Sequence, residues 1–190
     1  MSGALFPKAY AGMVQRLRVP SGFLLAILVA VFARPTLASL IAGTPLCVAG
    51  LWLRGWAAGH LRKNEDLTVD GPYAWLRNPL YAGTLLSASG VVIAAAQPAL
   101  LFLLLAVFVF IYWPVVEQEE SHLRNLFPGY AGYAAAVPAL LPKLPRHSLR
   151  RGKRFSWAVY RRNREHKALL ALLTGYALLI WKAMGWPGVA

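Results

Sequence analysis

Residues that could do chemistry gather in two short stretches of an otherwise apolar chain. The first stretch, LTVDGPYAWLRNPLYAG from Leu67 to Gly83, combines an aspartate, an Arg-Asn-Pro triplet and two tyrosines. The second begins with three glutamates within four residues, at Glu117, Glu119 and Glu120. Carboxylates accept hydrogen bonds and favour cations, whereas arginine, asparagine and tyrosine donate hydrogen bonds. Placed side by side, the two stretches could bind a zwitterionic or cationic small molecule.

The elements that carry these stretches are long apolar runs. Hydrophobic residues make up 58% of the 190 residues and the mean hydropathy is +0.49, whereas a soluble domain is roughly half apolar. Almost no charge falls in residues 21–33, 36–53, 79–96, 98–116 and 168–181. A helix needs about 20 apolar residues to cross a bilayer, or fewer where flanking groups reach the interface. The sequence therefore predicts an all-α integral membrane protein with about five transmembrane helices.

This division predicts a single membrane domain over residues 1–190. We expect residues 1–20 to form an interfacial segment, residues 21–116 to hold four spans with a motif loop at 54–78, residues 117–167 to form a cytoplasmic loop and residues 168–186 to hold the fifth span. The first apolar run also fits a signal-peptide core, but further spans follow it at once, which favours an uncleaved anchor. Glycines in the second span, Gly43, Gly50 and Gly55, should allow close contact between helices.

The charges predict the orientation of the chain. Eighteen of the 20 lysines and arginines fall in residues 1–20, 54–78 and 117–167, and only Arg34 and Lys182 fall on the other side. The positive-inside rule then places the N-terminus and both long loops in the cytoplasm, and we expect an inner (cytoplasmic) membrane. The net charge of +13 favours anionic membrane lipids as partners over a nucleic acid. The basic stretch 146–167 is expected to lie on that lipid surface as an interfacial helix.

The two polar stretches should meet at one membrane depth. The spans 79–96 and 98–116 are joined by a tight turn, so they must be antiparallel neighbours. Arg77 and Asn78, at the start of one span, then lie beside Glu119 and Glu120, at the end of the other. Each feature also has a simpler interpretation. Asn78 could be an ordinary helix cap, and the glutamates could form a solvated helix end that pairs with Arg124.

Taken together, the two stretches resemble the signature of the isoprenylcysteine carboxyl methyltransferase family, which belongs to a wider group with the membrane phospholipid N-methyltransferases. The matching motifs are Gly71 and Tyr73, then Arg77, Asn78, Pro79, Tyr81 and Gly83, and then Glu119, Glu120 and Leu123. The resemblance runs from about His60 to Pro142, which is nearly half of the chain.

The resemblance implies a membrane methyltransferase that binds S-adenosyl-L-methionine on the cytoplasmic side and acts on a lipophilic small-molecule substrate. No Rossmann domain is implied, and the sequence has no G-x-G-x-x-G fingerprint. Carried over by position, the cofactor-binding residues are His60, Leu67, Thr68, Gly71, Tyr73, Arg77, Asn78, Pro79, Leu80, Tyr81, Glu119 and Glu120. The histidines and the single Cys47 show no metal-binding spacing, so we expect no metal site. The oligomeric state stays open.

Two positions depart from the family pattern. Asn78 replaces the usual histidine, so this position can donate and accept hydrogen bonds but cannot titrate. Val115 stands one helical turn before the glutamate pair, where the eukaryotic prenylcysteine enzymes carry an arginine associated with the substrate carboxylate. The methyl acceptor is therefore open between the carboxylate of a prenylated cysteine-like compound and a lipid amine. Glu120 and His122 are candidate bases, and neither is assigned a catalytic role.

Two other classes of function compete with a methyltransferase. Membrane sterol and steroid reductases share a similar Arg-His-Pro-x-Tyr segment and bind NADPH, whose phosphates call for cations. The motif loop instead carries Glu65, Asp66 and Asp70, which favours a positively charged ligand. The third class is a small basic membrane scaffold without enzymatic activity, and the glutamate pair at a helix end argues against it.

Overall fold

The structure, a computed structural model of the 190-residue chain, describes residues 7–143 and 153–185. The start of the predicted interfacial segment, residues 144–152 of the predicted cytoplasmic loop and the last residue of the predicted fifth span lie outside these described residues. Within them the chain forms helices and connecting loops and no strand, which confirms the predicted all-α class.

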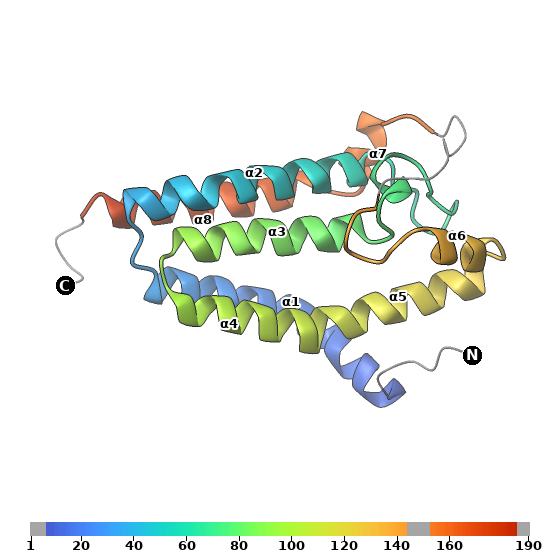
Figure 1. The fold of residues 1–190 in the computed structure, drawn as a ribbon, viewed down its shortest axis with the longest axis horizontal. Coiled ribbons are helices and arrows are strands. Elements are labelled where there is room, and N and C mark those ends of the chain that lie inside the picture. The colour runs from blue at the N-terminus through green and yellow to red at the C-terminus, as the bar shows by residue number, and fades with distance from the viewer. Residues whose placement is uncertain (1–6, 144–152, 186–190) are drawn as a thin grey trace.

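The long helices form an antiparallel bundle (Figure 1). They are α1 (Lys8–Phe32), α2 (Leu37–Ala58), α3 (Pro79–Ala94), α4 (Pro98–Val107), the π-helical segment η2 (Phe108–Tyr112), α5 (Trp113–Leu126) and α8 (His166–Ala183). The short elements are η1 (Gly71–Ala74), α6 (Tyr130–Ala136) and α7 (Trp157–Arg162). They gather at the end of the bundle where α2 and α5 finish and α3 begins. This polar end holds both of the chemistry-bearing stretches.

Three helices among the described residues are long and apolar enough to cross a membrane. They are Gly12–Phe32, Leu37–Ala58 and the continuous helix Pro98–Leu126, which comprises α4, η2 and α5. Helix α3 is apolar but shorter, and α8 does not meet the same measure of length and hydropathy. Outward faces expose large apolar side chains such as Phe23, Ile41 and Phe102, which suit a lipid environment. The chain is an integral membrane protein.

Two helix boundaries differ from the sequence prediction. The described part of the predicted interfacial segment and the first span form one helix, α1, which continues through Pro20. A proline inside a helix removes one backbone hydrogen bond and favours a kink, and Figure 1 shows the first turns of α1 inclined away from the bundle. The helix of the fourth predicted span does not end with the apolar run at Val116 but continues to Leu126. Glu119 and Glu120 are therefore part of the same helical rod as the span.

A seam of small residues holds α2 against α3. A side-chain carbon added at Gly50 would lie 2.6 Å from the backbone oxygen of Gly83, and one added at Gly90 would lie 2.6 Å from the backbone oxygen of Gly43. These positions need glycine because the two backbones approach too closely for any side chain. The predicted role of Gly43 and Gly50 is confirmed. The third glycine, Gly55, faces α7 and lies outside the seam.

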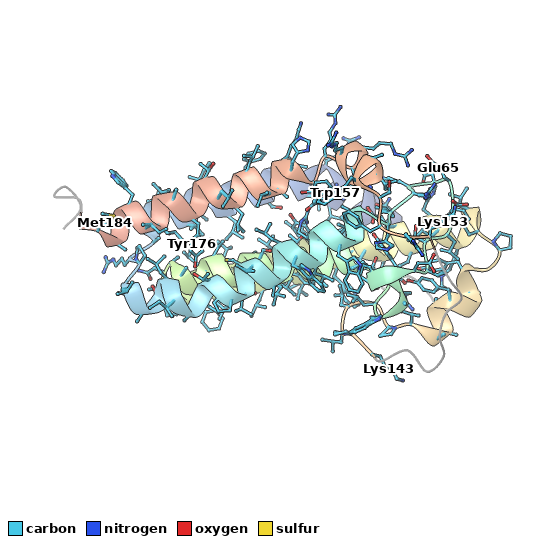
Figure 2. All side chains as sticks on the ribbon, turned by 90° about the horizontal axis from the view of Figure 1, so that it is seen from above. Glu65, Lys143, Lys153, Trp157, Tyr176 and Met184 are labelled. Atoms are coloured by element: carbon cyan, nitrogen blue, oxygen red, sulfur yellow. The ribbon has the colours of Figure 1, made fainter. Side chains whose placement is uncertain are left out.

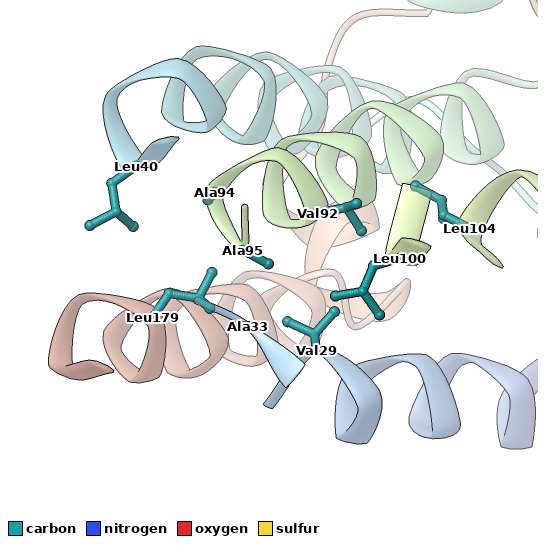
Figure 3. Packing of buried hydrophobic residues seen from close by; sticks show 9 residues of the cluster. All are labelled: Val29, Ala33, Leu40, Val92, Ala94, Ala95, Leu100, Leu104 and Leu179. Atoms are coloured by element: carbon teal, nitrogen blue, oxygen red, sulfur yellow. The ribbon is translucent and has the colours of Figure 1, made fainter. Parts of the chain in front are cut away.

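The apolar core lies toward the opposite end of the bundle (Figure 3). Its buried members are Val29, Ala33, Leu40, Val92, Ala94, Ala95, Leu100, Leu104 and Leu179. At this end the backbone N–H of Arg34 donates to the carbonyl of Ala95 at 2.8 Å, which ties the two turns together. Lys182 of α8 donates to the carbonyl of Ala30 at 2.9 Å and so satisfies a group that the end of α1 leaves unpaired. Apolar packing and these two hydrogen bonds together hold the helices at the end of the bundle opposite the polar end.

Candidate active site at the polar end of the bundle

The first feature of the polar end is a buried ion pair between the start of α3 and α5. Arg77 donates from Nε and Nη2 to the two carboxylate oxygens of Glu120, at 2.9 and 3.0 Å. The Asn78 amide donates to the same carboxylate at 2.9 Å, and Arg77 Nη1 donates to the carbonyls of Ala134 and Val137. The Arg77 and Glu120 side chains are 14% and 13% exposed, so water screens the pair little. The Arg77–Glu120 pair therefore joins the start of α3 to α5 and α6.

The second feature is a half-exposed chain of hydrogen bonds through Arg18, Tyr81 and Glu119. The Tyr81 hydroxyl donates to Glu119 Oε1 at 2.9 Å and accepts from Arg18 Nη1 at 2.9 Å. Arg18 Nη1 also lies 3.5 Å from Glu119 Oε1. The Glu119 side chain is 43% exposed. Glu119 is thus the member of the glutamate pair that a bound molecule could reach.

These contacts decide between the interpretations of the glutamate pair. The predicted meeting of the two helix ends is present, because Arg77, Asn78 and Tyr81 all contact a glutamate. The considered pairing with Arg124 is wrong, since Arg124 lies over the ring of Tyr130, 5.8 Å from its centre. Successive helical residues differ by about 100° in direction, so the two neighbouring glutamates meet different partners.

The third feature is a polar hollow of about 180 Å³ in the motif loop. It is lined by His60, Arg62, Asp66, Leu67, Thr68, Asp70 and Lys153. His60 is buried and its Nδ1 lies 2.9 Å from the carbonyl of Trp56, so Nδ1 must carry the proton and Nε2 can accept. Gly71 has a φ of 58°, and a side chain there would lie 2.8 Å from His60 Nε2. Position 71 therefore requires glycine for two reasons. Its positive φ disfavours other residues, and any side chain would clash with the His60 ring.

The segment 153–165, called the clasp below, docks onto the motif loop and covers this hollow. Lys153 forms an ion pair with Asp66, and its backbone N–H donates to Asp70 at 3.0 Å. The hydrogen bond from Lys153 holds the pKa of Asp66 below its usual value. Arg162 pairs with Glu65 at 2.7 Å. Figure 2 shows Glu65 and Lys153 together at the polar end.

The clasp corrects the interpretation of the acidic loop. Glu65, Asp66 and Asp70 were expected to favour a positively charged ligand, yet all three bond to the clasp. They do so because the described part of the basic stretch folds back onto the loop. Asn163 strengthens this docking by donating to the carbonyls of Ala58 and Leu61 at 2.8 and 2.9 Å. It thereby satisfies the Ala58 carbonyl, which the end of α2 leaves unpaired, and the Leu61 carbonyl of the motif loop.

A second, largely buried ion pair joins the last residue of the clasp to α2. Arg54 of α2 donates from Nε and Nη2 to the carboxylate oxygens of Glu165, at 2.5 and 3.0 Å. Its Nη1 donates to the carbonyl of Leu80 at 3.3 Å and to the hydroxyl of Thr84. The side chain of Glu165 is only 9% exposed. The pair joins α2, α3 and the start of α8 at one point.

Tyr73 of η1 contacts α6. It is buried, and its carbonyl accepts from the Tyr133 hydroxyl at 2.7 Å. Burial raises the pKa of Tyr73 above its ordinary value, and Tyr133 raises it further. The charges of Glu119 and Glu165 also raise this pKa, and the charge of Arg54 lowers it. The Tyr73 hydroxyl therefore stays protonated at neutral pH.

The residues carried over from the family pattern fall into two groups at this end. His60, Leu67, Thr68 and Gly71 surround the hollow, whereas Arg77, Asn78, Tyr81, Glu119 and Glu120 lie where α3 meets α5. Tyr73 accepts from Tyr133 through its carbonyl, Pro79 opens α3, and Leu80 offers its carbonyl to Arg54. Their role in binding a cofactor stays a prediction. In the described parts of the chain, no group of three or more His, Cys, Asp or Glu could hold a metal ion.

Reasoning from the sequence missed Arg18, Arg54 and Glu165. Arg18 lay in the segment interpreted as interfacial, and no local pattern links it to Glu119. Arg54 and Glu165 flank apolar runs, and a charge at such a boundary needs a partner or water, which is a weak signal that names neither partner. Gln118 was also overlooked. Its side-chain oxygen is buried without a hydrogen-bond partner among the described residues.

Comparison with known proteins finds a family match for the middle of the chain. The family model described as phospholipid methyltransferase matches residues 38–129, a range that holds α2, the motif loop, α3 and the helix of the glutamate pair. Residues 38–129 belong to the phospholipid methyltransferase family. The resemblance found in the sequence is thereby confirmed, because a curated relative is the protein-S-isoprenylcysteine O-methyltransferase of Schizosaccharomyces pombe. That relative is 28% identical over 148 residues, which are 73% of this chain and 61% of that protein.

Two further relatives carry names from metal resistance. The cobalt-zinc-cadmium resistance protein CzcN of Cupriavidus metallidurans is 35% identical over 119 residues, 62% of this chain and 52% of that protein. The nickel-cobalt-cadmium resistance protein NccN of Alcaligenes xylosoxydans is 31% identical over 101 residues, 53% and 46% of the respective chains. The chain thus spans about half the length of these two curated relatives. No solved structure matches it significantly.

Proposed function

We propose that this protein is a membrane methyltransferase that uses S-adenosyl-L-methionine to methylate a lipophilic small molecule. The observation that carries the proposal is the convergence of Arg18, Tyr81 and Glu119 beside the Arg77–Glu120 pair, at one end of an apolar bundle. The family match over residues 38–129 and the Schizosaccharomyces pombe relative support the type of reaction.

The chemistry of the polar end fits this cofactor. Its ammonium and sulfonium groups suit a reachable carboxylate such as Glu119, and its ribose hydroxyls suit acceptors such as Thr68 and His60 Nε2. The hollow of about 180 Å³ is smaller than the roughly 300–1,000 Å³ of small-molecule sites. The clasp is the part that can enlarge it. Its ion pairs are about half exposed, so water and salt screen them and they hold the clasp only weakly.

The residues of the site would act mainly by position. When bound, the cofactor would supply a sulfonium-linked methyl group, which passes in line to the acceptor as its bond to sulfur breaks and the neutral thioether leaves. The Arg77–Glu120 pair holds α3 against α5, and such fixed geometry lowers the barrier for a reaction that depends on alignment. Tyr81 orients the Glu119 carboxylate toward its accessible side. A carboxylate acceptor needs no base, whereas an amine must first lose a proton, and Glu119 is the reachable carboxylate that could receive it.

We infer further that α3 and α8 also cross the membrane, which makes five spans with the polar end in the cytoplasm of an inner membrane. At 1.5 Å per residue their 16 and 18 residues extend about 24 and 27 Å, close to the roughly 30 Å of a bilayer core. The antiparallel bundle and the distribution of lysine and arginine support this topology. A reporter fused after Lys143 should behave as cytoplasmic and one at Gln97 as external, and the reverse result at either point contradicts it.

Equilibrium binding to the purified protein tests the function directly. Radiolabelled S-adenosyl-L-methionine should bind, and NADPH should neither bind nor compete. Binding of NADPH alone would favour the reductase class, and binding of neither would favour a scaffold. Glu119→Gln should weaken cofactor binding by about 10- to 100-fold, the equivalent of one charge-assisted hydrogen bond. Glu117→Gln is the matched control, because Glu117 accepts from Trp113 at 3.2 Å and should bind as wild type does.

A further inference from the structure

The long helix Pro98–Leu126 is not α-helical throughout, because the π-turn η2 interrupts it just before the segment that carries the glutamates. Here the backbone N–H of Trp113 donates to the carbonyl of Phe108, five residues earlier instead of four. Such turns are rare and are often found at functional sites. The helix thus accommodates one residue more than a straight α-helix of the same length would hold.

Pro114, which follows the π-turn, explains why the turn forms. Proline has no N–H to donate to the carbonyl four residues earlier, and in a regular α-helix its ring collides with that carbonyl. Here the carbonyl belongs to Phe110, and it accepts instead from the hydroxyl of Tyr10 in α1, at 2.5 Å. The widened turn therefore relieves the clash with the proline ring, and Tyr10 satisfies the carbonyl that the proline leaves unpaired.

The extra residue determines which side chain at the polar end shares a face with the apolar half of the helix. Gln118 lies 18 residues after Leu100, which is about five full turns at 3.6 residues each. In a straight α-helix Gln118 would therefore point in the direction of Leu100. Because the π-turn holds one residue more, that direction passes to the next residue, Glu119. Glu120 then points about 100° away from it.

The contacts with α1 and α3 agree with this register. Leu100 belongs to the apolar core, which holds residues of α1 and α3 (Figure 3). Glu119 contacts the same two helices, through Arg18 of α1 and Tyr81 of α3. Tyr112, the last residue of the π-turn, does so too: its hydroxyl donates to the Arg18 carbonyl at 3.5 Å, and its ring lies edge-on to that of Tyr81. A straight helix would turn both Tyr112 and Glu119 about 100° from these partners.

We propose that Pro114 is a positioning residue of the candidate active site, acting through the π-turn that it enforces. The extra residue of that turn directs Glu119 into the site and Glu120 onto Arg77. Without it the helix would direct Gln118 into the site and Glu119 onto Arg77, and the reachable carboxylate would be lost. The inference rests on the proposed function, because that function gives Glu119 its role in binding the cofactor.

Deleting the extra residue together with the proline tests the register without any cofactor. Val109 lies in the π-turn and is 49% exposed, so it is the residue to delete. With Val109 deleted and Pro114→Ala, a straight α-helix still directs Glu120 onto Arg77, and the Tm should stay within about 4 °C of wild type. In a helix without a π-turn, the same deletion would place Ser121 against Arg77 and lower the Tm at least as far as Glu120→Gln does.

The proline itself is tested by making Pro114→Ala in both chains. In the chain that lacks Val109 the helix is straight and the proline ring meets the carbonyl four residues earlier, so Pro114→Ala should raise the Tm by about 6–12 °C. In the full-length chain the π-turn already relieves this clash, and the same substitution should change the Tm by about 4 °C at most. Equal shifts in the two chains would remove the role assigned to Pro114.

A one-residue insertion tests the link to the cofactor. An alanine inserted after Val109 adds a second extra residue and turns the glutamate segment by about 100°. Gln118 then lies in the site and Glu119 against Arg77, so the buried ion pair is kept and the reachable carboxylate is lost. Binding of radiolabelled S-adenosyl-L-methionine should weaken by about 10- to 100-fold. Adding Gln118→Glu should restore it to within about 3-fold of wild type, whereas Gln118→Glu without the insertion should not strengthen binding.

A loss of Tm as large as that of Glu120→Gln, in the chain with Val109 deleted and Pro114→Ala, overturns the inference. So does a folded inserted chain that binds the cofactor as wild type does, or one that Gln118→Glu fails to rescue. If the inserted chain does not fold, the deletion still decides the register. Failure of the wild-type protein to bind S-adenosyl-L-methionine overturns the proposed function instead. The two failures are distinguishable, because the comparisons of Tm need no cofactor.

Discussion

The two neighbouring glutamates should separate stability from cofactor binding. Glu120 is largely buried, with 13% of its side chain exposed, and is bonded to Arg77 and Asn78, whereas Glu119 is half exposed and bonded to Tyr81 and Arg18. Replacing either residue with glutamine preserves its shape and removes its charge. We expect Glu120→Gln to destabilise the fold and Glu119→Gln to leave it nearly unchanged, although the two residues are adjacent in sequence and both accept a hydrogen bond from α3.

The expected losses of folding stability follow from how deeply each glutamate is buried. Removing one partner of a buried ion pair costs about 3–5 kcal/mol, and the glutamine oxygen can still accept one hydrogen bond, so Glu120→Gln should cost about 2–4 kcal/mol. For a chain of this size that corresponds to a fall in Tm of roughly 4–16 °C. The Arg18–Glu119 pair is 39% and 43% exposed. Exposed pairs contribute about 0–1 kcal/mol, so Glu119→Gln should lower Tm by a few degrees at most.

The assay is thermal unfolding of both variants in one detergent, followed by titration with radiolabelled S-adenosyl-L-methionine. Adding Arg77→Gln to Glu120→Gln should restore part of the lost stability, because it removes the buried charge that has no partner. The restoration is partial, since Arg77 also bonds to two carbonyls. If Glu119→Gln proves more destabilising than Glu120→Gln, the division of roles between the two glutamates is wrong.

Three further predictions concern the seam, the α3 cap and the buried tyrosines. Gly90→Ala should destabilise by about 1–3 kcal/mol through overpacking, whereas Gly175→Ala, which has open space around it, should be neutral or stabilising by up to about 1 kcal/mol; equal thermal shifts would contradict the seam. Asn78→Asp places a second carboxylate beside Glu120, so its Tm deficit should grow between pH 5 and pH 8, whereas Asn78→Ser, which does not ionise in this range, should show no such growth. Burial raises the pKa values of Tyr130 and Tyr133. The folding stability that comes from keeping these two phenols protonated is therefore complete below the ordinary tyrosine pKa of about 10. It is lost as the pH rises through their raised pKa values. Absorbance at 295 nm should then show tyrosinate from these residues only together with unfolding, and early titration of a folded protein would refute their burial.

The parts of the fold that could be predicted are those that depend on local pattern. Apolar runs predicted the helices, and the tight turn between α3 and α4 required the start of one rod to meet the end of the other. The bonds from Arg77, Asn78 and Tyr81 to the glutamates follow from that geometry. Gly43 and Gly50 were recognised for a similar reason, because small residues in a membrane helix mark close packing.

The parts that could not be predicted depend on contacts between distant segments. Nothing around Arg18 indicates that α1 brings it to Tyr81 and Glu119. The acids of the motif loop were interpreted as a ligand site because a sequence shows charges without their partners. In the structure the partners are Lys153 and Arg162 of the clasp. A basic stretch attracted to lipid and one attracted to an acidic loop have the same composition, so only tertiary structure separates them.

The seam between α2 and α3 also makes the native chain a convenient background for thiol chemistry. Cys47, the one cysteine of the sequence, is buried there and lies 2.6 Å from where a Gly90 side chain would begin. Its sulfur lies 3.5 Å from the Ser87 carbonyl, in a contact with no room for a maleimide or a spin label. A cysteine introduced at an exposed site such as Trp157 would therefore be the one thiol that reacts in the folded protein. Probes on the clasp can be attached without first replacing Cys47, and the tight packing of the two helices stays undisturbed.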